Sequence, residues 1–105
     1  MNEVKNLKVY ESNGRWSASW DRDGKHFDMD ELYGCSHKRT FAQLKNVLDE
    51  DHGIILPSEI AVKACAIQKG FKNVYAVDDR LITVRKDPKS IQKPVVYGCK
   101  DYYSL

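Results

Sequence analysis

Basic side chains are concentrated in the second half of this 105-residue chain, and they are the groups best suited to bind phosphates. Residues 63–100 carry 9 Lys or Arg against 3 Asp or Glu, whereas residues 1–62 carry 8 basic and 11 acidic side chains. Such a cluster can neutralise a nucleic-acid backbone. The sequence therefore predicts a small non-enzymatic nucleic-acid-binding module, DNA or RNA being left open, that uses Lys63, Lys69, Lys72, Arg80, Arg85, Lys86 and Lys89.

A second hypothesis places function on the polar face of an N-terminal sheet. That face mixes both signs of charge, so either water or a partner must cover it. A small adaptor or inhibitor of the kind that phages and mobile elements carry would bind a protein through such a face. Its candidate contacts are Lys8, Tyr10, Arg15 and His26.

Three patterns resemble enzyme or metal sites without completing one. The acidic stretch from Asp21 to Glu31 departs from a calcium loop after its first ligands, because Lys25 and His26 stand where a ligand and a glycine belong. Asp23-Gly24-Lys25 has the form used by metal-dependent nucleases, but a tight turn also explains it. Cys35 and His37 are too close for the usual paired zinc spacing. We predict no catalytic residues, metal or cofactor, with a cysteine nucleophile or a nuclease as the enzymatic alternative.

Composition predicts one globular domain over residues 1–105. The chain is 42% apolar and 30% charged with a net charge of +2, which is typical of soluble proteins. It has no apolar run long enough to cross a membrane. Its 3 cysteines lack a CxxC pattern and suit a reducing compartment, so we expect a cytoplasmic protein.

The elements that position these residues begin with a β-meander. Asn13-Gly14 and Asp23-Gly24 are typical of two-residue hairpin turns. These turns pair Leu7 with Trp20, Val9 with Ala18, Glu11 with Trp16, Trp20 with Phe27, and Ala18 with Met29. Both registers place the same apolar set on one face: Leu7, Val9, Trp16, Ala18, Trp20, Phe27 and Met29.

Two helices are expected next, packed on that apolar face. Thr40 and Gln43 predict a capping box at the start of the first helix, and Gly53 predicts its end. Ser58 caps the second helix and Gly70 ends it. The predicted buried stripe of the second helix is Ile60, Ala61, Ala64, Cys65 and Ile67.

A β-hairpin over residues 73–86 completes the predicted order βββ-α-α-ββ, an α+β fold with an antiparallel sheet. Its inner face is Tyr75, Val77, Ile82 and Val84, and residues 95–97 offer a further short strand. A winged helix is the alternative, with residues 59–69 as recognition helix and 78–80 as wing tip.

Residues 7–53 resemble the AP2-like arm-type DNA-binding domains of phage integrases. Gly14-Arg15-Trp16 opens the second strand, Arg22-Asp23-Gly24-Lys25 turns into the third, and a helix starts at Thr40-Phe41. The resemblance implies DNA binding by the exposed sheet face, where Lys8, Arg15 and Lys25 would supply positive charge.

Overall fold

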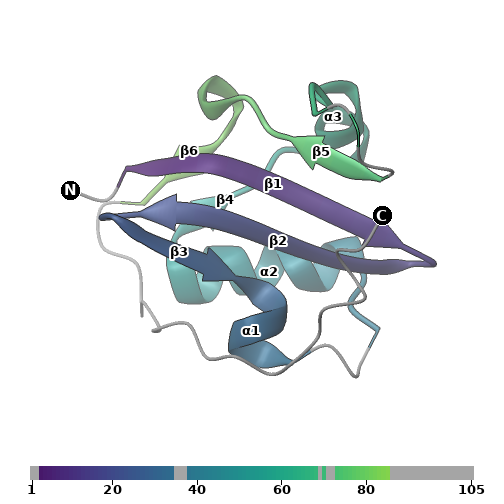
Figure 1. Cartoon of the computed structure of the whole chain (residues 1–105), viewed down its shortest axis with the longest axis horizontal. Helices are drawn as coiled ribbons and strands as arrows, with labels where there is room; N and C mark the ends of the chain where they lie inside the picture. The colour runs from purple at the N-terminus through teal and green to yellow at the C-terminus, as the bar shows by residue number, and fades with distance from the viewer. Residues whose placement is uncertain (1–2, 35–37, 69, 71–72, 86–105) are drawn as a thin grey trace.

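Four antiparallel strands form the main sheet of the computed structural model, which describes residues 3–34, 38–68, 70 and 73–85 (Figure 1). The strand order is β3-β2-β1-β5. The strands are β1 (Val4–Ser12), β2 (Arg15–Arg22), β3 (Lys25–Asp28) and β5 (Val74–Ala76). With helices packed against this sheet, the predicted α+β class is confirmed.

The two predicted turns join β1 to β2 and β2 to β3. Asn13 and Gly14 have φ of 51° and 80°, and Asp23 and Gly24 have φ of 54° and 76°. Two successive positive φ values match the right-handed twist of the flanking strands, which explains the Asn-Gly and Asp-Gly pairs. The expected register is confirmed where β1 pairs Val9 with Ala18 and Glu11 with Trp16, and where β2 pairs Trp20 with Phe27.

The meander departs from the prediction at both ends. The register of β1 shifts between Lys5 and Lys8, and Asn6 within this bulge has a φ of 56°. At the other end, Met29 starts helix α1 (Met29–Tyr33) instead of pairing with Ala18. The Asp28 side chain accepts a hydrogen bond from the Asp30 amide, so a helix cap ends β3 one residue early.

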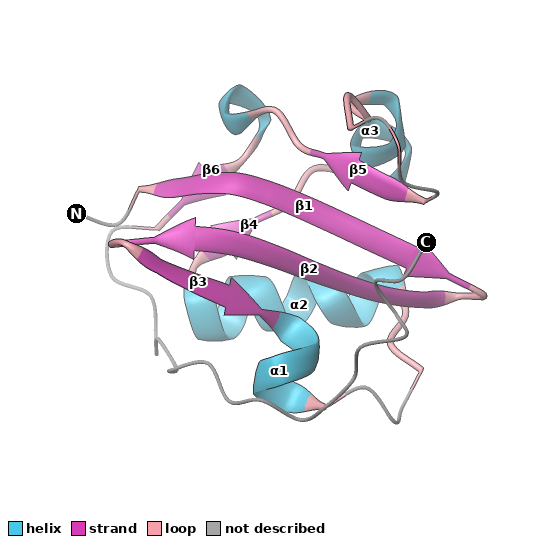
Figure 2. Cartoon of the chain, viewed as in Figure 1, coloured by secondary structure: helices cyan, strands magenta, loops and turns pink. Residues whose placement is uncertain are grey.

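Helix α2 (Phe41–His52) lies against one face of the sheet, as Figure 2 shows. Its predicted capping box is confirmed: the Thr40 hydroxyl accepts from the Gln43 amide at 3.1 Å, and Gln43 Oε1 accepts from the Thr40 amide at 2.8 Å. Gly53 ends the helix with a φ of 68°, as expected. The core between sheet and helix contains Leu7, Val9, Trp16, Ala18, Trp20, Phe27, Leu44 and Leu48.

The chain then forms β4 (Ile54–Ile55), α3 (Glu59–Ala64), the 3₁₀ helix η1 (Asp79–Leu81) and β6 (Thr83–Val84). The predicted hairpin over 73–86 is wrong in its pairing, because β5 pairs with β1 and β6 pairs with β4. The 3₁₀ helix η1 separates β5 from β6, and each of the two strands pairs with a different strand. The winged-helix alternative fails for the same reason, and the possible strand at 95–97 lies outside the described residues.

Helix α3 begins as predicted but is shorter. The Ser58 hydroxyl accepts from the Ala61 amide at 3.2 Å, which confirms the N-cap. The helix ends at Ala64 with Cys65 as its C-cap, six residues before the predicted end at Gly70.

Candidate functional site

The three predicted phosphate contacts that the structure describes, Lys63, Arg80 and Arg85, each lie beside a carboxylate. Lys63 Nζ is 3.3 Å from a Glu59 oxygen, one helical turn away. Arg80 holds Asp78 at 2.7 Å, and Arg85 Nη2 is 2.9 Å from Asp49 Oδ1 at the far end of α2. The hydrogen bonds from Arg80 lower the pKa of Asp78 to about 2. These pairs cancel much of the local positive charge, although all three cationic side chains remain exposed.

These three predicted phosphate contacts come from different elements: α3, η1 and the residue after β6. The other four predicted phosphate contacts, Lys69, Lys72, Lys86 and Lys89, lie outside the described residues.

The polar sheet face differs from the open surface that the sequence suggested. Ser17 is fully buried and Ser19 is 3% exposed. Tyr10 shares a hydrogen bond of 3.1 Å with Ser19, and burial raises the pKa of the Tyr10 phenol. Of the four predicted contacts, Lys8, Tyr10 and Arg15 are half-buried. The centre of this face is therefore less exposed than the sequence suggested.

His26 lies at the edge of that face, in a small polar group. Its Nδ1 is 2.7 Å from Asp21 Oδ1, and Asn6 Nδ2 donates to Asp21 Oδ2 at 2.9 Å. These two hydrogen bonds lower the pKa of the Asp21 carboxyl. Asp21 and His26 are a cross-strand pair of β2 and β3, so the group also fastens the hairpin.

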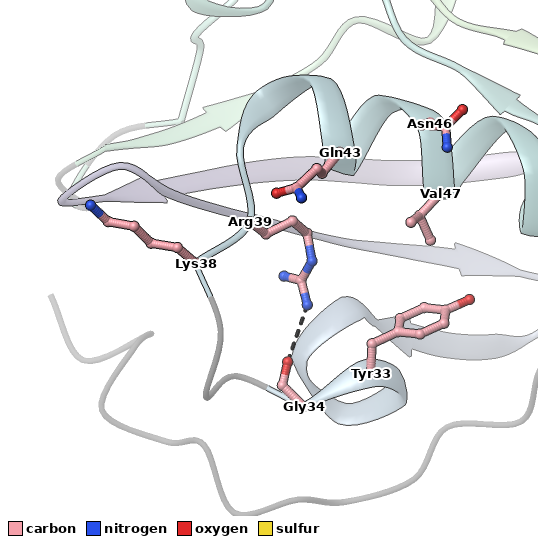
Figure 3. A pocket seen from close by; sticks show the side chains of 7 residues that line it. All are labelled: Tyr33, Gly34, Lys38, Arg39, Gln43, Asn46 and Val47. Atoms are coloured by element: carbon pink, nitrogen blue, oxygen red, sulfur yellow. Dashed lines mark hydrogen bonds between the residues drawn. The ribbon is translucent and has the colours of Figure 1, made fainter.

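A cleft of about 290 Å³ lies between α1 and the start of α2 (Figure 3). Arg39 reaches across it, donating to the carbonyls of Trp16 at 2.9 Å and Gly34 at 3.1 Å and to Asp30 Oδ1 at 3.1 Å. The guanidinium is thus occupied in joining β2, α1 and the segment before α2. The remaining lining residues are Tyr33, Lys38, Gln43, Asn46 and Val47. This cleft is a structural junction that the sequence did not indicate.

The outer side of α3 is the largest departure from the prediction. Ile60 is 83% exposed and Ile67 is 72% exposed, although both belonged to the predicted buried stripe. Val62 is buried instead, with Ala61 and Cys65 half-buried beside it. The helix is apolar on both sides, so the 3.6-residue period fits either orientation and does not select one.

We call the exposed apolar set the α3 face; it consists of Ile60, Ala64, Ala66 and Ile67. Ile67 also lines a groove of about 580 Å³ between the end of α3 and the strands β1 and β5. Leu7, Ala76 and Val77 contribute apolar atoms to this groove, and its polar lining residues are Asn6, Lys8, Gln68, Asp78 and Asp79. Lys8, predicted as a protein contact, thus lies beside the α3 face.

Within residues 3–34, 38–68, 70 and 73–85, histidine, cysteine, aspartate and glutamate side chains form no group of three that is suited to hold a metal ion. Among the helices of these ranges, none has the length and apolar character needed to span a bilayer.

No family model, curated protein or solved structure matches this chain.

Proposed function

We propose that this chain is a small non-enzymatic protein-binding module that holds its partner through the α3 face. The observation that carries the proposal is the exposure of Ile60 at 83% and Ile67 at 72%, on α3 and just after its C-cap, with the exposed Ala64 and Ala66 between them in the sequence. Clustered large apolar side chains on a small domain mark interaction sites more often than isolated ones do.

The two isoleucines set the free energy that a partner can gain by covering this surface. Burying one such side chain fully is worth about 1.5–3 kcal/mol. A partner that covers both gains several kcal/mol before the cost of association, which is enough to dominate a small interface.

The neighbouring groove supplies the polar rim that such an interface needs. Lys8 and Asp79 line it with opposite charges, and neither side chain is fully buried. Protein interfaces combine an apolar centre with a hydrated polar margin, and the α3 face with this groove has that composition.

Affinity capture with the purified chain as bait tests the proposal. Ile60→Glu puts a charge into the apolar set at its most exposed large side chain, so we expect capture of the partner to fall at least tenfold, equivalent to about 1.4 kcal/mol. Leu81→Glu is the matched control, because Leu81 is 47% exposed on η1 and lies outside the α3 face. Equal capture by wild type and by Ile60→Glu would refute the proposal.

Nucleic-acid binding is the second candidate, supported by the excess of 9 basic over 3 acidic residues in 63–100. A phosphate must compete with the carboxylates that flank Lys63, Arg80 and Arg85. Binding of this kind would be non-specific and sensitive to salt.

Variants of the basic surface test whether nucleic acid binds there. Replacing Arg85 and Lys86 together by alanine should weaken binding to labelled DNA or RNA evenly across sequences and reduce the salt slope by about one unit per lost contact. Asp49→Asn removes the carboxylate beside Arg85 and should tighten binding instead. Fluorescence anisotropy at two salt concentrations measures both effects, and unchanged binding by both variants excludes this site.

A further inference from the structure

We propose that the α3 face binds a second copy of this chain, with the two α3 helices antiparallel about a two-fold axis. The inference rests on the proposed function, since it names the partner of the same surface. It is carried by two features that make this surface complementary to itself, one of size and one of charge.

The first feature is a large residue and a small residue one helical turn apart. Ile60 and Ala64 are both exposed on the same side of α3, separated by four positions. When two such helices run antiparallel with the axis near position 62, Ile60 of each copy lies over Ala64 of the other. A two-fold axis repeats this fit twice, and the absence of a large side chain at 64 lets the helices approach closely.

The second feature is a pair of opposite charges with the same spacing. Glu59 and Lys63 lie 3.3 Å apart on α3, with about half of each side chain exposed. An antiparallel arrangement with the axis near position 61, one residue from the axis that places Ile60 over Ala64, brings Glu59 of each copy near Lys63 of the other, so the charges can pair between copies as well as within one. A partner helix with the same sign at both positions would form only one of these two pairs and would place like charges together at the other, so it would gain less from the contact.

The small area of the contact limits the expected affinity of the dimer. Helix α3 has six residues, so even with Ile67 and the groove margin the interface falls below the roughly 1,200 Å² of a standard stable complex. We therefore expect a reversible dimer with a dissociation constant of about 10–500 µM.

Sedimentation velocity over about 10–500 µM of the full chain tests the proposal, because this range brackets the expected dissociation constant. The wild type should shift from monomer to dimer, Ile60→Glu should remain monomeric, and Leu81→Glu should behave as wild type. Circular dichroism of each variant confirms that it folds.

The charge pair gives a second, independent readout. Glu59→Lys leaves two positive side chains on the face and Lys63→Glu leaves two negative ones, so each variant alone should be monomeric. An equimolar mixture of the two should recover dimers, because unlike faces then meet. Recovery in the mixture also shows that both variants are folded.

A wild type that remains monomeric throughout the range overturns the proposal, as does a dimer that survives Ile60→Glu or a mixture that fails to associate. The same experiments test the proposed function separately from the dimer. If the wild type is monomeric but Ile60→Glu still loses a captured partner of different mass, the α3 face binds another protein and not a second copy.

Discussion

At the scale of single residues, His52 shows how local contacts fix a protonation state. Its ring is fully buried at the end of α2, with ring centroids 4.9 Å from Trp20, 6.2 Å from Phe27 and 6.2 Å from Tyr33. Tyr33 donates its hydroxyl hydrogen to Asp51 Oδ2 at 2.9 Å, so its contact of 2.9 Å with His52 Nε2 requires the imidazole to donate. Burial, together with the nearby Arg22 guanidinium and against the opposing Asp51 carboxylate, lowers the pKa of His52 to about 4.

Acid should therefore destabilise the fold through His52. The unfolded chain takes up this proton near pH 6.5 and the folded chain only near pH 4, so the free energy of unfolding falls as the pH drops through this window. A difference of this size amounts to about 3 kcal/mol. Urea unfolding at intervals from pH 7 to pH 4 measures the slope.

The matched variant for this prediction is His52→Gln. Its side-chain amide still supplies an N–H donor but cannot titrate. It should lower stability at neutral pH but remove most of the slope between pH 6.5 and 4. The carboxyls whose pKa values are lowered by hydrogen bonds, those of Asp21 and Asp78, act only below this window. An unchanged slope in His52→Gln would assign the acid sensitivity to other groups.

At the scale of elements, the capping box of α2 is a local signal that decides where a helix starts. Thr40 and Gln43 satisfy each other's backbone amides, and neither contact depends on the rest of the fold. For this reason the start of α2 was predictable from four residues. The same holds for the Ser58 cap and for the two turns, whose Asn-Gly and Asp-Gly pairs tolerate positive φ.

Removing the cap should cost a measurable part of the stability. We expect Thr40→Ala to lower the free energy of unfolding by about 1 kcal/mol, because the Gln43 amide loses its acceptor. Gln43→Ala should cost less, and the double variant should cost less than the two changes added together, since they break one reciprocal unit. Additive losses in urea unfolding would show that the two hydrogen bonds act independently.

The orientation of α3 is an element-scale feature that no local signal determines. At helical spacing Ile60 and Ala64 lie toward one side of the segment and Val62 toward the other, with Ala61 and Cys65 between them, so either side is apolar enough to face the core. The structure buries Val62 and leaves Ile60 exposed. Packing of α3 beside β5 makes this choice, and it depends on tertiary contacts that sequence periodicity does not contain.

At the scale of the whole molecule, long-range strand pairing decides what lies where. The residues of β5 and β6 were predictable as strands, but their partners were not, because β5 joins the edge of β1 and β6 joins β4. These pairings bring the α3 face and the groove along β1 and β5 together from separate parts of the sequence. The proposed binding surface is thus a product of topology, whereas the basic stretch is a product of composition.

Site-directed photocrosslinking tests the central claim most directly. A photoreactive amino acid replaces Ile60 in one variant and Leu81 in a matched control, and both are irradiated in the cells that make the protein. We expect adducts from position 60 and few from position 81, with an adduct of twice the 12.1 kDa mass marking a second copy. Adducts that form equally at both positions, or none at position 60, would contradict a binding role for the α3 face.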